Sequence, residues 1–408
     1  FATIGIVWLT WCLANHARGA AVARWSTLVL STMVLTYISA GAVMTDTFLV
    51  FGTTLSLVSV WFVLSGRSDY WRWWFFMGLA IGLLSKGPLA VVLTVIPLVL
   101  WAAIFRQRLQ PLKKLPWLLG SLLTLAIAVP WYVLAELKTP GFLNYFIIGE
   151  HFSRFLDPGW AGDLYGSAHD RPKGMIWIFW LWASFPWGII GLVGFGLAAA
   201  RGKTKDIFTG AVQDASTLYL LFCAITPMLF FTLAGNTLWT YILPSLPFSA
   251  ILIAGWVSKL DLGAWSRVRS GAVLLVPVLI TLVVFISVSG VIPLKTEKQL
   301  ISRYESIHQA GDSPIFYIGE MPFSARFYSL GDAVEIISTE FNSLLEADGY
   351  ARVFAVIPNH AVDEVLGPRA TDAQKLGENE RYQLFSIDLP PTDSQNDPVD
   401  SELNSKND

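Results

Sequence analysis

The 408-residue chain carries little charge. Only 14% of its residues are Asp, Glu, Lys or Arg, and the formal net charge is −2. Soluble domains carry about 25% charged residues, so this composition excludes an ordinary soluble protein. A net charge this close to zero also gives no reason to expect a nucleic-acid partner.

Cysteines are scarce, and the common hydrolase motifs are missing. The two cysteines, Cys12 and Cys223, lie in separate apolar segments. This spacing predicts packing residues and not a disulfide or a metal site. The chain contains no H-E-x-x-H, no G-x-S-x-G and no Walker loop. Zinc proteolysis, serine hydrolysis and ATP hydrolysis therefore have no motif support.

Long apolar runs take up most of the chain instead. Hydrophobic residues make up 54% of the sequence, and the mean hydropathy is +0.54. Because a helix needs about 20 apolar residues to cross a bilayer, these runs predict a polytopic α-helical membrane protein with about ten transmembrane helices. The runs are 1–15, 26–44, 48–65, 73–84, 88–105, 116–135, 175–200, 215–234, 240–256 and 272–293.

The chain begins at Phe1, inside the first apolar run. No basic segment and no cleavage site accompany this run, so it does not resemble a signal peptide. We therefore expect an N-terminal part to precede Phe1.

Basic residues recur in every second loop between the apolar runs. They are Arg18, Arg24, Arg67, Arg72, Arg106, Arg108, Lys113, Lys114, Arg201, Lys203, Lys205, Lys259, Arg267 and Arg269. By the positive-inside rule, these loops face the cytoplasm. The alternate loops, at 45–47, 85–88, 137–173 and 235–237, are then predicted to face outside, together with the chain after residue 293.

The character of the sequence changes at about residue 296. Strand-like runs lie at 314–318, 334–337, 352–357 and 383–388, and helical stretches lie near 322–329, 339–347 and 360–366. This alternation predicts a small extracytoplasmic α/β domain with a largely parallel sheet. The expected organisation is a transmembrane bundle at 1–295, the α/β domain at 296–390 and a disordered tail at 391–408.

Charged side chains gather in the outer loop around Glu150, His151 and Arg154. On an α-helix, His151 and Arg154 would share a face. A carboxylate and an imidazole could ligate one divalent metal ion if Asp46 joined them from the neighbouring loop. Alternatively, His151 is a solvated histidine at the interface. The Arg154 guanidinium offers a fork for a phosphate.

Asp46 and Lys86 each allow two interpretations. A carboxylate at the bilayer centre costs about 2.5–3.5 kcal/mol, so Asp46 either caps the next helix or faces a wet cavity. Lys86 either snorkels to the interface or holds a phosphate near the membrane surface. The positive-inside rule gives no reason for a lysine in an outer loop, which favours the phosphate.

A second polar group follows in the same outer loop, at His169, Asp170, Arg171 and Lys173. It predicts either a mobile lid over a cavity or an ordinary polar loop that ends before the next helix. Together, the outer loops supply an acid, an imidazole and several cations at the depth of a lipid phosphate. This favours a lipid-phosphate substrate that is handled outside.

Several short motifs occur in a characteristic order between about residues 40 and 250. They are Met44-Thr-Asp-Thr47, Leu84-Ser-Lys-Gly-Pro-Leu89, Pro130-Trp-Tyr132, Pro140-Gly-Phe142, Glu150-His-Phe-Ser-Arg-Phe155, Phe185-Pro-Trp187 and Tyr241-Ile-Leu-Pro244. As an ordered set, they resemble the C-type membrane glycosyltransferases of the bacterial protein O-mannosyltransferase superfamily. The resemblance is nearest to the lipid A aminoarabinose transferase branch.

This resemblance implies a membrane glycosyltransferase in the bacterial inner membrane, with its C-terminal domain in the periplasm. Such an enzyme moves a hexosyl or pentosyl group from a polyprenyl-phosphate carrier to a lipid, glycan or protein acceptor on the periplasmic side. The expected catalytic base is a carboxylate of the first outer loop, which would precede Phe1, and Asp46 would support it.

The resemblance also implies roles for individual residues. Asp46, Glu150 and His151 match positions around the family's cavity and its metal site. Lys86 and Arg154 match cationic positions near the carrier phosphate.

Tyr241 belongs to the same predicted cavity or lid as His169, Asp170, Arg171 and Lys173.

Two stretches depart from the family pattern. The family often has a lysine before the Pro-x-Tyr-x-Leu-Pro turn, where this chain has Asn236-Thr-Leu-Trp-Thr-Tyr241. Residues 162–171 also differ from the lipid A branch. The sequence therefore assigns neither aminoarabinose nor lipid A.

Two other classes of protein stay open. A polyprenyl-lipid flippase or transporter often shows internal repeats and helices broken near the midplane, whereas this chain shows no repeat. A non-catalytic membrane scaffold would leave the charges at 46, 86 and 150–154 unexplained.

Overall fold

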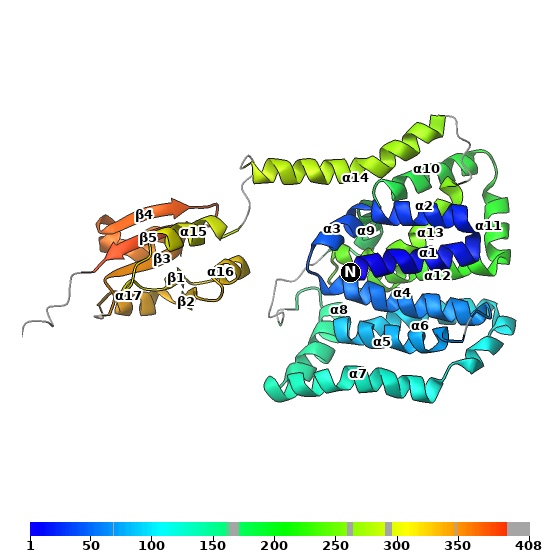
Figure 1. The fold of residues 1–408 in the computed structure, drawn as a ribbon, viewed down its shortest axis with the longest axis horizontal. Helices are drawn as coiled ribbons and strands as arrows, with labels where there is room; N and C mark the ends of the chain where they lie inside the picture. The colour runs from blue at the N-terminus through cyan, green and yellow to red at the C-terminus, as the bar shows by residue number, and fades with distance from the viewer. Residues whose placement is uncertain are drawn as a thin grey trace, which may run out of the picture. The chain divides into compact units, whose positions relative to one another are not determined.

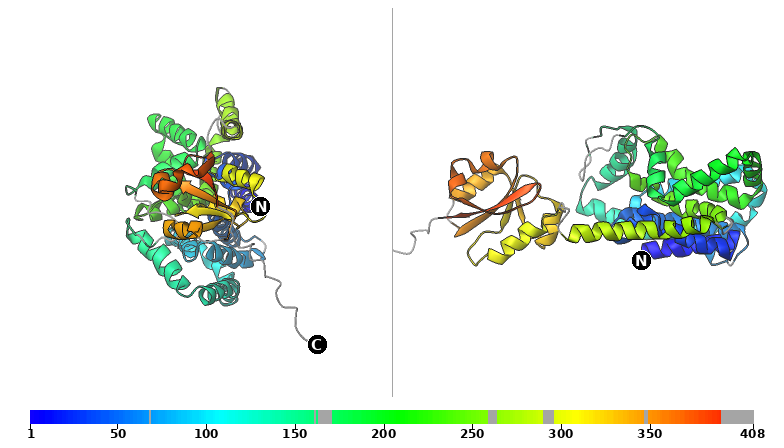
Figure 2. Two further views of the ribbon diagram at one scale, coloured as in Figure 1. Left: turned by 90° about the vertical axis from the view of Figure 1, so that its left-hand side faces the viewer. Right: turned by 90° about the horizontal axis from the view of Figure 1, so that it is seen from above.

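The computed structural model describes residues 1–67, 69–160, 162, 171–258, 264–289, 296–346 and 349–389. The chain forms two compact units, Phe1–Thr281 and Leu282–Asp408. Figures 1 and 2 show helices throughout the first unit and a sheet with helices in the second. The predicted domain limit at 295 stays a prediction, and the predicted tail at 391–408 lies outside the described residues.

The first unit is helical, and both cysteines are buried in it without forming a disulfide. Its elements are α1 (Ala2–Arg18), α2 (Ala20–Ser31), α3 (Val34–Gly41), α4 (Thr45–Leu64), α5 (Trp71–Lys86), α6 (Leu89–Ile104), η1 (Arg106–Arg108), η2 (Gln110–Lys114), α7 (Trp117–Lys138), η3 (Asn144–Ser153), α8 (Arg154–Leu156), α9 (Met175–Ala183), α10 (Trp187–Ala200), α11 (Thr204–Gln213), α12 (Ala215–Thr232), η4 (Trp239–Ser245), α13 (Leu246–Val257) and α14 (Ala264–Val288), which extends across the boundary between the units.

Each of the ten apolar runs becomes a helix or a bent pair of helices. Among the described residues, five segments are long and apolar enough to cross a membrane alone, and three bent pairs raise this number to eight. Helices α1 and α5 account for the two remaining runs but have only 17 and 16 residues. The multi-pass helical membrane fold is thus confirmed, and the number of ten spans stays a prediction.

Helices α4 and α5 approach each other so closely that their backbones touch. A Cβ atom added to Gly52 would lie 2.6 Å from the Gly78 carbonyl oxygen and 2.7 Å from the Gly82 nitrogen. The Ser56 hydroxyl donates to the Phe75 carbonyl at 2.9 Å. Small residues four positions apart permit this kind of helix contact in lipid. The pairing is antiparallel, so the first turn of α4 lies beside the last turn of α5.

Two bent helix pairs are joined at their bends. Helices α2 and α3 meet at 65°, and α9 and α10 meet at 107°. The buried Trp187 indole donates to Thr32 Oγ1 at 2.8 Å, and the Val34 amide donates to the Phe185 carbonyl at 3.1 Å. The Phe185-Pro-Trp187 motif therefore has a packing role, because it connects the two bends.

A charged contact joins two of the loops that were predicted to be cytoplasmic. Arg18 Nη1 lies 2.7 Å from Asp214 Oδ2. Partial burial alone would raise the pKa of Asp214, but hydrogen bonds from Thr217 and Ser216 and the Arg18 charge outweigh it and lower the pKa to about 2. Asp214 also caps α12, because its side chain accepts from the Ser216 amide. This contact holds the first and seventh loops together at one end of the bundle.

The second unit contains a five-stranded sheet in the order β2-β1-β3-β5-β4. Its strands are β1 (Ile315–Ile318), β2 (Val334–Ile336), β3 (Arg352–Pro358), β4 (Ala373–Glu378) and β5 (Tyr382–Asp388). Strand β1 pairs in parallel with β2 and β3, whereas β5 is antiparallel to both β3 and β4. The prediction of a largely parallel sheet is therefore wrong for two of the four pairings. The prediction missed β4, a polar edge strand, and its short turn into β5 permits only a hairpin.

Helices cover both faces of this sheet. They are α15 (Lys298–Ile307), α16 (Phe323–Tyr328), α17 (Ser338–Glu346) and α18 (Val362–Leu366), with the short η5 (Gly367–Thr371) after them. Phe341 of α17 is buried in the core on one face, and Leu300 of α15 and Ala325 of α16 are buried in the core on the other. The three predicted helical stretches are confirmed, and α15 is an addition.

A fully buried carboxylate connects the start of α15 to the sheet. The Glu297 side chain accepts hydrogen bonds from Arg381 at 3.0 Å, from Asn379 at 3.0 Å and from the Tyr317 hydroxyl at 3.4 Å. Burial, followed by the nearby Glu297 charge, raises the pKa of Tyr317. A buried charge with three donors is stable, but it depends on each of them.

We expect the Arg381→Met substitution to destabilise the second unit more than Glu297→Gln. Loss of Arg381 leaves a buried carboxylate uncompensated, which costs roughly 3–5 kcal/mol. Glu297→Gln removes that charge and leaves Arg381, whose side chain is 41% exposed, in contact with water. Hydrogen exchange of the β1 and β5 amides in the whole protein measures the two effects. Equal protection in the two variants would contradict this account.

Candidate functional site

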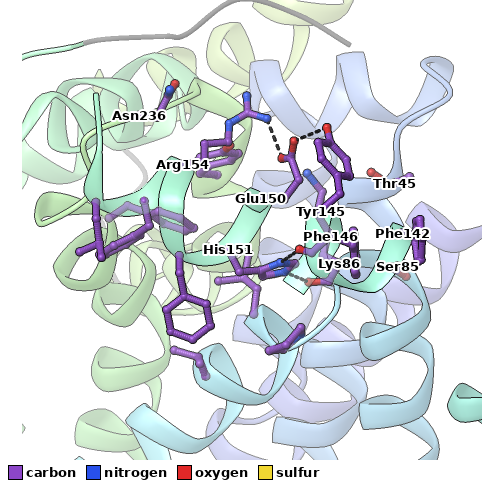
Figure 3. A pocket seen from close by; sticks show the side chains of 18 of the residues that line it. Thr45, Ser85, Lys86, Phe142, Tyr145, Phe146, Glu150, His151, Arg154 and Asn236 are labelled. Carbon is purple, nitrogen blue, oxygen red and sulfur yellow. Dashed lines mark hydrogen bonds and ion pairs between the residues drawn. The ribbon is translucent and has the colours of Figure 1, made fainter. Parts of the chain in front are cut away.

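The four loops predicted to face outside meet around one cavity. Its volume is about 1080 Å³, and residues of all four loops line it. Figure 3 shows their labelled side chains around this space. Most of the wall is apolar and aromatic, including Trp131, Phe142, Phe146, Phe152, Phe155, Phe230, Phe231 and Tyr241. The charged side chains on the wall are Lys86, Glu150 and Arg154, and His151 lies among them.

The segment that carries Glu150 and His151 is a π-helix, η3. In such a helix, residues five positions apart become neighbours. Accordingly, the Tyr145 hydroxyl donates to Glu150 Oε1 at 2.7 Å, and His151 Nδ1 bonds the Phe146 carbonyl at 2.6 Å. The sequence predicted an α-helical face shared by His151 and Arg154, but in the structure these two side chains take different partners.

His151 joins η3 to the end of α5. Its Nε2 lies 2.9 Å from the Lys86 carbonyl oxygen, and its Nδ1 faces the Phe146 carbonyl. Both acceptors are carbonyl oxygens, so the two bonds form together only when both ring nitrogens carry hydrogen. Gly87 makes this approach possible: its φ is +56°, and a Cβ there would lie 2.8 Å from the Phe146 ring and 3.1 Å from the His151 ring.

Lys86 lies between a carboxylate and an aromatic ring. Its Nζ is 3.3 Å from Asp46 Oδ1 and 5.7 Å from the centre of the Tyr241 ring. The side chain of Lys86 is 28% exposed and that of Asp46 is 14% exposed. Met44 is the N-cap residue of α4 and makes no side-chain capping bond, so the structure does not show Thr45 or Asp46 as the cap. Asp46 therefore acts as the counter-ion of Lys86.

Arg154 forms a second ion pair on the same wall. Its Nη1 lies 2.8 Å from Glu150 Oε2, while Tyr145 bonds the other oxygen of that carboxylate. Figure 3 shows Glu150 between Arg154 and Tyr145, with a dashed line to each. The carboxylate thus fixes the direction in which the guanidinium points. The main chain is also fixed here, because the Gly235 amide donates to the Phe155 carbonyl at 2.8 Å.

The predicted metal ligands do not converge in the described part of the chain. No group of three or more His, Cys, Asp or Glu side chains that could hold a metal ion occurs there. Asp46 pairs with Lys86, Glu150 pairs with Arg154, and both nitrogens of His151 face carbonyls. A divalent ion at Asp46, Glu150 and His151 stays a prediction that this geometry does not support.

The predicted lid residues are only partly described. His169 and Asp170 lie outside the described residues. Arg171 and Lys173 are described, are exposed and do not line the cavity. Tyr241, the fifth member of that predicted set, does line it.

Sequence reasoning missed Tyr145 and Gly87 as parts of the site. Tyr145 orients Glu150 across a five-residue interval, and such an interval indicates contact only if the segment is known to be π-helical. The role of Gly87 depends on a neighbour 64 positions away, which no local pattern reports.

The chain is similar in sequence to known membrane proteins that transfer sugars. Residues 1–146 match the family described as "Dolichyl-phosphate-mannose-protein mannosyltransferase". An undecaprenyl phosphate-alpha-4-amino-4-deoxy-L-arabinose arabinosyl transferase 1 from Pseudomonas fluorescens is 30% identical over 277 residues, which are 65% of this chain and 43% of that protein. The corresponding transferase of Pectobacterium atrosepticum is 28% identical over 286 residues, 66% of this chain and 47% of that protein. The chain thus spans less than half the length of these curated relatives.

The fold is also found among solved structures. The crystal structure of ArnT from Cupriavidus metallidurans bound to undecaprenyl phosphate superposes with a TM-score of 0.73 at 15% sequence identity, covering 96% of this chain and 84% of that one. The apo structure of the same protein gives a TM-score of 0.70. In its fold, in the family match over residues 1–146 and in its ordered motifs, the chain is similar to the C-type membrane glycosyltransferases, which include the protein O-mannosyltransferases and the aminoarabinose transferases.

Proposed function

We propose that this protein transfers a sugar from a polyprenyl-phosphate carrier to an acceptor at the membrane surface. The observation that carries the proposal is the placement of Lys86 and Arg154 on the wall of a mostly apolar cavity. Apolar and aromatic walls suit a prenyl chain, whereas an ammonium and a guanidinium suit its phosphate. An ammonium has three hydrogen-bond donors, so its contact with Asp46 leaves capacity for a phosphate oxygen.

The names of similar proteins support this choice of carrier. The two curated relatives are named as transferases of a sugar linked to undecaprenyl phosphate, and the solved structure of similar fold contains undecaprenyl phosphate. The sugar in the names of the relatives is an aminopentose. An undecaprenyl-phosphate aminopentose is therefore the first donor to test, with a lipid, glycan or protein as acceptor.

The two ion pairs define what the chain can contribute to the reaction. An acceptor hydroxyl gives its proton to a general base as its oxygen attacks the anomeric carbon, and the bond from that carbon to the phosphate oxygen breaks. Negative charge then grows on the departing phosphate, where preorganised cations stabilise it. We assign this role to Lys86 and Arg154. Asp46 and Glu150 position the two cations, each through its ion pair.

The cavity should open toward the periplasm. The loops that line it are those without the repeated Lys and Arg, and the basic loops follow the positive-inside rule on the other side. The proposed location is the bacterial inner membrane, with the C-terminal α/β domain in the periplasm.

A transfer assay tests the proposed function directly. Protein expressed from its complete gene is incubated with labelled undecaprenyl-phosphate sugars and membrane extract. Release of label from the carrier into an acceptor fraction supports a transferase. If the labelled carrier instead crosses vesicle membranes without release of its sugar, the protein is a flippase and the proposal fails.

We expect the Lys86→Gln substitution to raise the KM for the carrier roughly 10- to 100-fold. A hydrogen bond to a charged group contributes about 1.5–3 kcal/mol, and 1.4 kcal/mol corresponds to a factor of ten. Lys138→Gln is the matched control, because Lys138 is exposed just beyond the cavity and does not line it. An unchanged KM in Lys86→Gln, or an equal rise in the control, would refute the phosphate assignment.

We expect Asp46→Asn to act through Lys86. Alone, it should lower kcat/KM, because the ammonium loses the partner that fixes its position. In a Lys86→Gln background, it should have little further effect, since two residues that act as one unit are not additive. A double-mutant cycle with kcat/KM as readout measures this coupling. Additive losses would show that Asp46 acts on its own.

Cysteine labelling tests the orientation. Cys12 and Cys223 are both buried, so an engineered cysteine at an exposed position reacts preferentially. In intact spheroplasts, an impermeant maleimide should modify Thr139→Cys, beside the cavity, and leave Lys203→Cys unmodified. Permeabilised cells should give both reactions. Labelling of only the position 203 cysteine in intact spheroplasts would invert the proposed topology.

A further inference from the structure

The second unit exposes three large apolar side chains next to one another in sequence and structure. Phe323 and Phe327 are four residues apart on α16, and Leu330 follows in the turn that ends this helix. Their exposed fractions are 72%, 73% and 91%. We call Phe323, Phe327 and Leu330 the α16 stripe. The opposite side of α16 is buried, because Ala325 is completely covered by the core.

The turn that carries Leu330 is unfavourable for a leucine. The Gly331 amide donates to the Arg326 carbonyl at 2.9 Å, and the Leu330 amide donates to the Phe327 carbonyl at 3.3 Å. This is the Schellman pattern, in which the first residue past the cap adopts the left-handed conformation and is usually glycine. Leu330 has a φ of +56° there. The chain thus places a β-carbon where the backbone disfavours one, and it directs an apolar side chain into solvent.

An apolar partner would account both for the exposure of the α16 stripe and for the left-handed conformation of Leu330. The three side chains are too few for a stable protein interface. At roughly 150 Å² each, they fall short of the approximately 800 Å² per partner that a stable complex buries. A contact with the bilayer needs no such minimum area. The second unit is already tethered to the membrane, so binding to its surface costs little further translational entropy.

The covalent connection supplies that tether. The apolar helix α14 ends at Val288, and α15 begins at Lys298. The nine residues between them can extend over no more than about 32 Å at roughly 3.3–3.6 Å each. The second unit is therefore held close to a bilayer surface.

The charged neighbours of the stripe agree with an interfacial position. Arg326 is exposed on α16 between the two phenylalanines, where a guanidinium can reach lipid phosphates while aromatic rings enter the acyl region. The acidic neighbours, Asp332 and Glu335, follow beyond the stripe and are also exposed.

From these observations, we propose that the α16 stripe inserts into the interfacial region of the bilayer and anchors the second unit to the membrane surface. Phe323, Phe327 and Leu330 provide the apolar contact, and Arg326 binds the anionic headgroups. This proposal depends on the membrane-spanning bundle and not on the proposed transferase activity.

The test uses the whole protein in nanodiscs that contain phosphatidylethanolamine and phosphatidylglycerol. An environment-sensitive fluorophore is attached at Phe327→Cys, and lipids with a spin label near the headgroup serve as quenchers. Ser343→Cys on α17 is the matched control, because Ser343 is also exposed but lies on a helix that covers the opposite face of the sheet. We expect at least threefold stronger lipid quenching at position 327 than at position 343. Equal quenching at both positions would overturn the proposal.

Leu330→Gly is a second variant that separates anchoring from folding. It removes the strained left-handed leucine, so the second unit should become more resistant to heat. At the same time, the loss of one apolar side chain should reduce the lipid quenching of a fluorophore at 327. Greater stability with unchanged quenching would overturn the contribution of Leu330. If quenching at 327 requires a labelled second copy in the same nanodisc and not labelled lipid, the stripe binds another protein molecule and the membrane anchor is refuted.

Discussion

The close contact of α4 with α5 is the constraint on which the site depends. In lipid, apolar surfaces gain little by leaving their surroundings, so helices associate through close packing and polar contacts. Gly52 and Gly78 let the two backbones meet, and this sets the register of the pair. That register brings Asp46, in the first turn of α4, to within 3.3 Å of Lys86, in the last turn of α5. The first ion pair of the cavity is therefore a consequence of packing about two helical turns away.

The second ion pair is local, because Glu150 and Arg154 lie four residues apart along the chain. The π-helical winding of η3 brings Tyr145 to the other oxygen of Glu150, and His151 lies against the end of α5. Because Gly87 has no side chain, His151 reaches the carbonyl of Lys86 and joins the two walls of the cavity. Carboxylates that could have ligated a metal ion are thereby engaged in orienting cations. An apolar cavity can contain such charges because each has a partner of opposite sign.

The two units depend on polar contacts of different kinds. In the first unit, charges lie at the ends of the helices, where Arg18 and Asp214 join two loops. In the second unit, the charge of Glu297 is completely buried and holds α15 against the sheet. This position of the charges agrees with a bilayer around the middle of each helix, because a charged side chain in the bilayer core has a high free-energy cost. The α16 stripe is the reverse case, because it places apolar side chains at the surface of the second unit.

Apolar runs and loop charge by themselves determined the helical membrane class, the ten hydrophobic segments and the grouping of four outer loops. These features follow from the free energy of transferring each side chain from water into the bilayer, which the sequence alone gives. Local patterns also predicted four of the five strands; β4 was missed because it is polar and lies at an edge. Lys86 and Arg154 were identified as cations beside a cavity, but their partners were not. The Glu150–Arg154 pair has the four-residue spacing of a local helix pair, but only the tertiary structure decided that Asp46 pairs with Lys86 and that His151 lies between the Lys86 and Phe146 carbonyls. The physical reason is that a side chain's partner depends on helix register and on backbone winding, and both are set by packing between segments distant in sequence.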